Sequence, residues 1–213
     1  MRYHLTVNIK PHYKRILIAT TNRGKAAEIA ELLIGCAAEF ISLDYLQQVA
    51  EPAEDGFTFA ENARIKAGYY AAKYNLPTVA DDSGLMVDAL NGAPGVHSSR
   101  LVPKGAGDMA RNKKLLAMME HIIEPEKRLA KFICVACFVE PAEHIEFVEE
   151  GELTGTIAFE PSGDAGFGFD PLFIPDGYDR TVASLGLGTK NRISHRKRAF
   201  EKLAHRIKGH WQE

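Results

Sequence analysis

The chain has 213 residues, of which 46% are hydrophobic and 25% are charged, and its formal net charge is −2 at pH 7. These values are ordinary for a globular protein, and the near-neutral balance argues against a general electrostatic nucleic-acid binder. No apolar run approaches the roughly 20 residues that a membrane span requires, and the N-terminus lacks a secretory h-region. We therefore expect a cytoplasmic protein, with residues 1–13 as an extension ahead of one domain over 14–213.

The N-terminal part of the chain is predicted to form a strand, a polar loop and a helix. Arg15–Ala19 has the apolar pattern of a buried strand, Ala26–Leu33 that of a helix, and Phe40–Leu43 that of a second strand. The loop Thr20–Lys25 between the first two elements would present free backbone N–H groups at a helix N-terminus, which favours a phosphate. It lacks the first glycine and the metal-binding hydroxyl of a Walker A motif, so an ordinary capped helix start remains an alternative.

A polar loop over 47–57 precedes the strongest helix prediction, Phe59–Tyr74. Thr58 and Glu61 have the spacing of a capping box, which marks the start of this helix. Lys66 projects away from the apolar stripe of the helix, where it would either reach a phosphate or lie along the surface.

The stretch Pro77–Val87 contains two β-prone apolar runs on either side of Asp81, Asp82, Ser83 and Gly84. We expect two strands with the acidic pair at a break between them. Taken alone, the break is either a solvated turn or a metal or acid/base site, because adjacent carboxylates repel and need compensation.

The middle of the chain is irregular over 90–107, and a helix is expected from Asp108 to about His121. Leu129–Val139 and Ile145–Ala158 have the composition of two long strands that pair antiparallel across the short segment between them. Cys134 and Cys137 lie three residues apart in the first of these strands and should point to opposite faces, so we interpret them as structural cysteines.

The C-terminal part contains the glycine-rich segment Gly163–Phe173, a polar loop, and a final helix from Ser194 to about Ile207. Phe169–Asp170 and the pair His195–Arg196 offer an aromatic ring, a carboxylate and cationic donors, which suit a nucleobase. Cations oppose the helix dipole at a helix start, and this conflict mildly favours a ligand there.

Glu54 and Asp82 are oxygen ligands of the kind that Mg²⁺ prefers when it also binds substrate phosphates. Glu61 is first a capping residue and only then a possible ligand. A phosphate bound at Thr20–Lys25 would need such acids nearby to hold its metal.

Taken together, the motifs resemble the inosine triphosphate pyrophosphatase family, over about Arg15 to Ala204. The motifs that carry the resemblance are Thr20-x-Asn22-x-Gly24-Lys25, Glu54-x-Gly56-x-Thr58-Phe59-x-Glu61-Asn62-Ala63, Ala80–Leu85, Gly92–Gly95, Gly166–Pro171 and Ser194–Arg196. The resemblance implies an elongated α/β fold, a mixed β-sheet flanked by helices with the active-site cleft between two lobes. It also implies a homodimer and Mg²⁺-dependent hydrolysis of XTP, ITP or dITP to the monophosphate and pyrophosphate.

The resemblance also implies roles for individual residues. Glu54 and Asp82 would bind the metal, and Asp82 would act as the proton acceptor, with Asp81 supporting it. The residues implied to hold the triphosphate are Thr20, Thr21, Asn22, Arg23, Gly24, Lys25 and Lys66. Those implied to hold the nucleoside are Ser83, Phe167, Gly168, Phe169, Asp170, Lys190, His195 and Arg196, the last two near the 6-oxo group of the purine.

One segment departs from the family pattern. Ser184–Gly188 lacks the acids that the family usually has there, so we expect a flexible, weakly charged loop.

Two alternative functions remain open. They are a Maf-like pyrophosphatase of different base preference and a non-catalytic nucleotide-binding protein. The first is disfavoured by Thr21–Gly24, and the second by the intact Glu54, Asp82 and Lys25.

Overall fold

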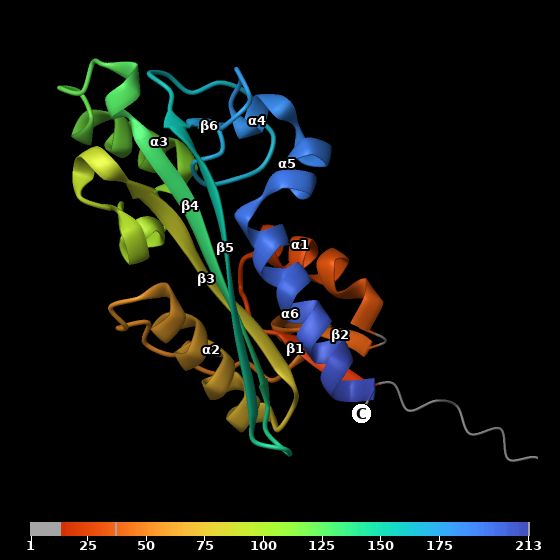
Figure 1. Ribbon diagram of the computed structural model, residues 1–213. Helices are drawn as coiled ribbons and strands as arrows, with labels where there is room; N and C mark the ends of the chain where they lie inside the picture. Colours follow the sequence, from red (N-terminus) through yellow and green to blue (C-terminus); the bar gives the residue numbers. More distant parts are fainter. Residues whose placement is uncertain (1–13, 37, 213) are drawn as a thin grey trace, which may run out of the picture.

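The computed structural model describes residues 14–36 and 38–212, so the extension expected at 1–13 lies outside the described residues. The molecule is built on a six-stranded sheet of order β2-β1-β3-β4-β5-β6 (Figure 1). The strands are β1 (Lys14–Ile18), β2 (Ala38–Ser42), β3 (Thr78–Val87), β4 (Leu129–Glu140), β5 (Ile145–Ile157) and β6 (Phe173–Pro175). The helices are α1 (Arg23–Leu33), α2 (Phe59–Tyr74), α3 (Gly107–Met118), α4 (Val182–Leu185), α5 (Leu187–Ile193) and α6 (His195–Gln212).

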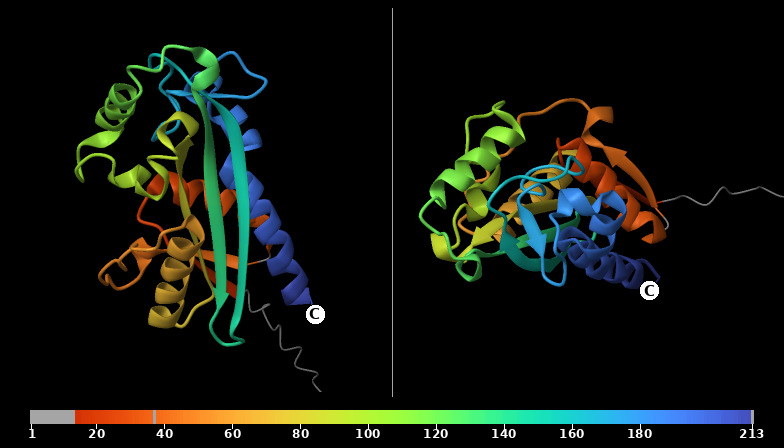
Figure 2. Two further views of the ribbon diagram at one scale, coloured as in Figure 1. Left: turned by 60° about the vertical axis from the view of Figure 1, so that its left-hand side comes forward. Right: turned by 90° about the horizontal axis from the view of Figure 1, so that it is seen from above.

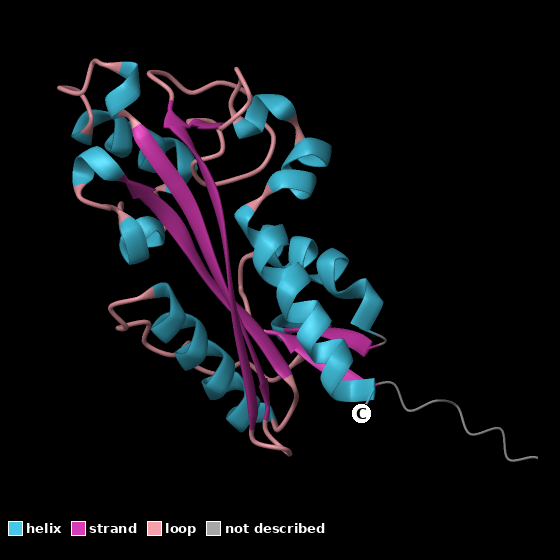
Figure 3. Cartoon of the chain, in the orientation of Figure 1, coloured by secondary structure: helices cyan, strands magenta, loops and turns pink. Residues whose placement is uncertain are grey.

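The sheet is mixed, as the sequence predicted. β1 pairs parallel with β2 and β3, whereas β3, β4, β5 and β6 pair antiparallel in succession. The long β4–β5 hairpin has the expected pairing, in which Glu140 lies opposite Ile145 at the turn and Leu129 lies opposite Thr156 at the far end. Strands β3 to β5 run the length of the molecule, and helices and loops surround them at both ends (Figure 3).

Helices cover both faces of the sheet and divide the molecule into two lobes (Figure 2). In the first lobe α2 packs on one face, through Ala63 and Ala67 against Leu17 and Val135, while α1 and α6 pack on the other face. The second lobe holds α3, α4 and β6 around the other ends of β3 to β5, with Leu115 and Phe173 in its core. The elongated two-lobed α/β fold expected from the sequence is therefore confirmed.

Helix α2 shows why local sequence predicted some elements well. Thr58 accepts a hydrogen bond from the Glu61 N–H (3.1 Å) and the Glu61 carboxylate accepts from the Thr58 N–H (3.0 Å), which is the predicted capping box. The helix ends at Tyr74 as predicted, and its C-terminal neighbour Asn75 adopts the left-handed conformation that closes many helices.

The other helix and strand boundaries differ from the predicted ones by a few residues. Helix α1 begins three residues earlier than Ala26, because Asn22 caps it by accepting from the Lys25 N–H. Helix α6 begins after Ser194, whose hydroxyl accepts from the Lys197 N–H, and it continues past Ile207 to Gln212.

The expected break in Pro77–Val87 is wrong. Strand β3 runs without interruption from Thr78 to Val87 and pairs with β4 along this whole length, including Asp81 opposite Ala136 and Asp82 opposite Val135. Buried carboxylates are tolerated inside a strand when charged and hydrogen-bonding partners surround them, and the site described below supplies these partners.

The expected flexible loop at Ser184–Gly188 is also wrong. Ser184 and Leu185 end α4, and Leu187 and Gly188 begin α5, so only Gly186 separates the two short helices. Gly186 has φ of +81°, a conformation that glycine adopts at little cost. The order of this segment therefore does not depend on acidic residues.

The cysteine prediction is confirmed. Cys134 packs on the α1/α6 side of the sheet and Cys137 on the α2 side, and both are buried free thiols. Within residues 14–36 and 38–212, no helix has the length and apolar character needed to cross a membrane.

Candidate functional site

A cavity of about 730 Å³ opens between the two lobes beside strand β3. Its place follows from the sheet: β1 pairs with β3 only as far as Ile18 opposite Val79, so no strand of the described residues neighbours the edge of β3 beyond that point. Side chains bind the backbone there instead. Lys66 Nζ donates to the Asp81 carbonyl (2.8 Å), and the Leu85 N–H donates to Ser98 Oγ (2.9 Å).

Gly84 lets the second lobe approach this edge closely. A Cβ atom at Gly84 would lie 2.5 Å from both the Gly95 carbonyl oxygen and Ser98 Oγ, which is too close for any side chain. The absence of a side chain at Gly84 therefore brings the segment around Ser98 against β3 and forms one wall of the cavity.

Most of the residues implicated by the sequence line this one cavity. These are Thr20, Thr21, Asn22, Lys25, Glu54, Lys66, Asp82, Ser83, Phe167, Gly168, Phe169, Asp170, Lys190, His195 and Arg196. Arg23 and Gly24 do not line it and instead begin α1. Gly24 has a packing role, because a Cβ there would lie 3.1 Å from the ring of Phe167.

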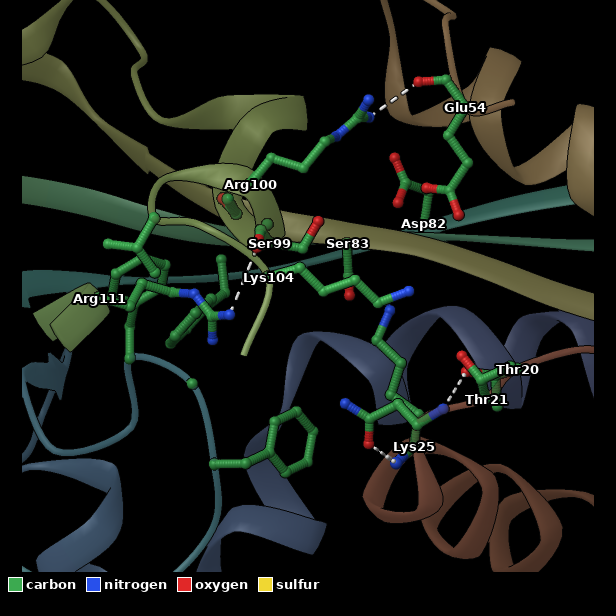
Figure 4. A pocket seen from close by; sticks show the side chains of 18 of the residues that line it. Thr20, Thr21, Lys25, Glu54, Asp82, Ser83, Ser99, Arg100, Lys104 and Arg111 are labelled. Carbon is green, nitrogen blue, oxygen red and sulfur yellow. Dashed lines mark hydrogen bonds between the residues drawn. The ribbon is translucent and has the colours of Figure 1, made fainter. Parts of the chain in front are cut away.

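The loop before α1 is organised by its own polar groups. The Asn22 N–H donates to Thr20 Oγ1 (3.2 Å), and Asn22 Oδ1 accepts from the Lys25 N–H (3.0 Å) (Figure 4). Lys25 then extends towards β3, where its ammonium lies 3.0 Å from Asp81 Oδ2. The loop thus combines a helix N-terminus with a lysine at the cavity wall, which is an arrangement that suits an anion.

Asp81 and Asp82 are adjacent but point to opposite faces of the strand, as successive residues must. Asp81 is 1% exposed and faces α1 and α6, where Lys25 and the Arg196 guanidinium (3.4 Å) neutralise it. Burial alone would raise the pKa of Asp81, but these cations hold it well below its usual value. Asp81 is therefore a charged structural group that lies on the opposite face of the strand from Asp82.

Asp82 faces α2 and the cavity. Asn62 Nδ2 donates to its Oδ2 (3.2 Å), and the ammonium of Lys66 lies 3.8 Å from its Oδ1 and 3.2 Å from Glu54 Oε1. Burial raises the pKa of Asp82, and Lys66 and Lys25 offset this only in part. A carboxylate with a raised pKa beside a cavity is suited to accepting a proton.

The two carboxylates fit the requirements of Mg²⁺. Glu54 and Asp82 both lie around the Lys66 ammonium, so a single cation already interacts with both of them. Among residues 14–36 and 38–212 there is no cluster of three or more acidic, histidine or cysteine ligands. Two carboxylates and an open cavity suit a metal that keeps several waters and shares the phosphates of a substrate.

The far end of the cavity combines aromatic and charged groups. The Lys190 ammonium lies 3.8 Å from the centroid of the Phe167 ring, 2.8 Å from Asp170 Oδ2 and 2.9 Å from Glu28 Oε1. Asp170 also accepts from the Phe167 N–H (2.9 Å), which fixes the turn that carries the ring. The exposed part of Phe167 is a flat surface on which a planar ligand can stack.

His195 and Arg196 begin α6 at the bottom of the cavity. Arg196 is 1% exposed and is held by Asp81, Glu28 and the Ser83 hydroxyl (3.1 Å). Carboxylates of the protein thus resolve the conflict with the helix dipole, and a ligand is not needed to explain it. His195 stacks on Phe132, and burial together with Arg196 lowers its pKa well below the usual value, so it is neutral at pH 7.

Several site residues were missed from the sequence. Glu28 joins Lys190 to Arg196, and it was missed because on a helix it has the pattern of an ordinary polar position. Asp108 and Asn112 of α3 bind both backbone groups of Gly168: Asp108 accepts from its N–H (2.6 Å) and Asn112 donates to its carbonyl (3.1 Å). Cavity residues from the segment before α3 and from α3 itself were missed as well, among them Ser98, Ser99, Arg100, Val102 and Lys104 before the helix and Arg111 within it. Sequence patterns carry no signal for contacts of this kind, because they join segments that are far apart in the chain.

Known proteins resemble this chain over nearly its whole length. The model of the Ham1 family matches residues 16–206. A protein of Oceanobacillus iheyensis named dITP/XTP pyrophosphatase is 41% identical over 89% of this chain and 96% of its own length. A protein of Frankia alni with the same name is 46% identical over 89% of this chain and 95% of its own.

The fold is also found in a solved structure of a HAM1 protein from Coxiella burnetii, which superposes with a TM-score of 0.83. That protein is 41% identical to this chain, and the match covers 92% of this chain and 99% of the other. The resemblance noted from the motifs is therefore confirmed over nearly the whole chain, and the protein belongs to the Ham1 family.

Proposed function

We propose that this protein hydrolyses non-canonical purine nucleoside triphosphates, namely XTP, ITP and dITP, to the monophosphate and pyrophosphate. Relatives that are 41–46% identical over about nine-tenths of the chain carry the name dITP/XTP pyrophosphatase. The observation that carries the proposal is that one cavity combines a loop at a helix N-terminus, two carboxylates and an aromatic pocket. Hydrolysis of this kind removes faulty nucleotides from the precursor pool.

The two ends of the cavity suit the two ends of such a substrate. The loop Thr20–Lys25 and Lys66 would bind the triphosphate, whose negative charge they partly offset. Phe167–Asp170 and Lys190 would enclose the base together with His195 and Arg196, and Ser83 would contact the nucleotide between the two ends. This division is supported by the two separate groups of side chains described above.

Asp82 would accept the proton of the water that attacks the α-phosphorus. Its raised pKa and its position at the cavity surface support this role, and the Asn62 amide holds its carboxylate in one orientation. As the bond to the bridging oxygen breaks, charge develops on the departing pyrophosphate, and Lys25 and Lys66 are placed to stabilise it.

Mg²⁺ is the cofactor that we propose, held by Glu54 and Asp82. When bound, the ion would neutralise phosphate charge and help to orient the attacking water. Lys66 lies beside both carboxylates, so its ammonium would contribute a further positive charge where the phosphates bind.

Selection of the base is proposed to depend on the 6-oxo group. His195 is neutral and buried, and its Nδ1 has no hydrogen-bond partner among the described residues. Together with Arg196 it offers donors that match an oxo oxygen, whereas the amino group of adenine would leave such donors unpaired.

We further propose that the protein is a cytoplasmic homodimer with one catalytic domain over residues 14–213. The homodimer would be checked by light scattering of the purified protein. A mass near that of one chain in solution would rule it out.

A triphosphate panel tests the proposed function. Purified protein is incubated with ITP, XTP, dITP, ATP and GTP, with Mg²⁺ or with EDTA, and pyrophosphate and orthophosphate are measured separately. We expect Mg²⁺-dependent pyrophosphate from the first three substrates and little from ATP. Equal turnover of all purines, or release of orthophosphate in place of pyrophosphate, would refute the proposal, and tight binding without turnover would favour a non-catalytic nucleotide-binding protein.

A further inference from the structure

The cavity wall formed by residues 98–111 carries cations that none of the roles above uses. Arg100, Lys104 and Arg111 all line the cavity from the second lobe, across from Lys25 (Figure 4). Their partners differ, and the differences indicate which of them is free to bind a ligand.

Nearly all the cations of the cavity are already bound to groups of the protein. Lys25 pairs with Asp81, Lys66 with Glu54 and Asp82, Lys190 with Glu28 and Asp170, Arg196 with Glu28 and Asp81, and Arg111 with Asp108. Arg100 has no carboxylate partner within the described part of the chain, but it donates to the Glu54 carbonyl (2.8 Å).

Lys104 is different. Within residues 14–36 and 38–212 its ammonium makes neither a hydrogen bond nor an ion pair, although it lines the cavity. In Figure 4 its side chain extends from the wall into the cavity, with its amine end turned towards that of Lys25. An exposed lysine is ordinarily surrounded by water on all sides. Lys104 instead points into a space bordered by the loop Thr20–Lys25, here called the phosphate loop, and by the Asp82 carboxylate.

The backbone that carries Lys104 is anchored on both sides. Before it, Ser98 Oγ binds the Leu85 N–H and the Gly95 carbonyl (2.7 Å), and Arg100 binds the Glu54 carbonyl. After it, Asp108 binds the Gly168 N–H (2.6 Å). Lys104 is thus a flexible cation on a fixed wall, which can reach into the cavity without movement of the lobes.

We propose that Lys104 binds the phosphates that leave as pyrophosphate, from the wall opposite Lys25. The inference rests on the proposed function and adds a contact from the second lobe to the triphosphate. The phosphate loop and Lys66 both lie in the first lobe, so Lys104 lets the leaving group be held from two sides. Among the cations that line the cavity, its ammonium is the one with neither a carboxylate nor a hydrogen-bond partner in the described residues, so a phosphate would bind it without displacing another partner.

The test compares ligands with and without the terminal phosphates. Inhibition constants for inorganic pyrophosphate and for IMP are measured against ITP hydrolysis for the wild type and for Lys104→Gln, Lys104→Glu and Lys113→Ala. Lys113 is an exposed lysine of α3 outside the cavity and serves as the control. Calorimetry with pyrophosphate provides a second measurement that does not depend on turnover.

We expect Lys104→Gln to weaken pyrophosphate binding roughly five-fold, as an exposed pair worth up to about 1 kcal/mol implies. Charge reversal in Lys104→Glu should weaken it further, while IMP binding changes less than about two-fold and Lys113→Ala resembles the wild type. Equal losses for pyrophosphate and IMP, or no loss for either, would overturn the role of Lys104. A wild-type protein that releases no pyrophosphate from ITP would instead refute the proposed function, so the two failures can be told apart.

Discussion

Replacement of Asn62 by alanine tests whether the site depends on a buried amide that contacts no substrate. Asn62 is fully buried and joins three parts of the site. Its Oδ1 accepts from the Gly56 N–H (2.9 Å) and its Nδ2 donates to Asp82 Oδ2 (3.2 Å) and, more weakly, to the Gly56 carbonyl (3.5 Å). Gly56 lies two residues after Glu54, so this amide sets the spacing between the two proposed metal ligands.

The expected loss of stability follows from these contacts. Loss of the Gly56 bond costs about 1 kcal/mol and loss of the bond to the Asp82 carboxylate about 2 kcal/mol, because one partner of the latter is charged. The free energy of unfolding should therefore fall by about 3 kcal/mol, which lowers the melting temperature by roughly 6–12 °C in a chain of this size. Turnover should fall roughly ten- to a hundred-fold, as for other residues that orient metal ligands.

Thr58→Ala is the matched control, because Thr58 caps the same helix but does not touch Asp82. Its loss should cost about 1 kcal/mol of stability and leave turnover nearly unchanged at a temperature where both variants are folded. Thermal unfolding and pyrophosphate release are measured on the same samples, and folding is checked by circular dichroism.

Normal turnover by a folded Asn62→Ala protein would show that this amide does not position the site. If the two variants lost turnover in the same proportion to their losses of stability, Asn62 would act on folding alone.

Three further predictions concern titratable groups. Asp82→Asn should still bind an inosine nucleotide in calorimetry but lose most turnover, and normal turnover would show that Asp82 is not the proton acceptor. The three cysteines, Cys36, Cys134 and Cys137, should not react with a thiol reagent at pH 8 until the protein unfolds. Burial raises the pKa of each thiol, to about 12 for Cys137, and so keeps the thiols protonated. Rapid labelling of the native protein would contradict this. The pKa of His195 in the folded protein lies below its unfolded value near 6.5. The contribution of neutral His195 to stability is therefore present above pH 6.5 and is lost as the pH falls through the folded pKa. Histidine NMR signals that show His195 charged at pH 7 would refute its neutral state.

The elements that were predicted well are those in which neighbouring residues decide the outcome. The capping box at Thr58 and the apolar stripe from Phe59 to Tyr70 both lie within one helix, and the structure has them as expected. The β4–β5 hairpin was predicted for the same reason, since its strands are separated by a short turn.

Contacts between distant segments could not be predicted in this way. Nothing near Glu28 in the sequence indicates that it lies between Lys190 and Arg196, which are more than a hundred residues away. Asp108 and Asn112 likewise look like ordinary polar residues of a helix, although they bind Gly168, which lies 60 and 56 residues further along the chain. The family resemblance indicated which residues would contact the nucleotide, but it did not indicate which residues position those side chains.

The acidic pair on β3 shows how the two kinds of information combine. Local composition predicted a break in the strand, because two adjacent carboxylates are costly inside a sheet. The strand continues because its alternation separates the two charges. Asp81 turns to one face, where Lys25 and Arg196 from α1 and α6 neutralise it, and Asp82 turns to the other, where α2 supplies Asn62 and Lys66.

This alternation also explains why the two acids have pKa values displaced in opposite directions. Asp81 lies among cations with no access to the cavity through its carboxylate, so it stays charged and holds α1 and α6 to the sheet. Asp82 is buried on the other face with weaker compensation from cations, so its pKa rises. A turn would have placed both carboxylates in water with similar pKa values. The continuous strand therefore makes one acid a structural ion and leaves the other at the cavity with a raised pKa, which is the property that the proposed role of Asp82 requires.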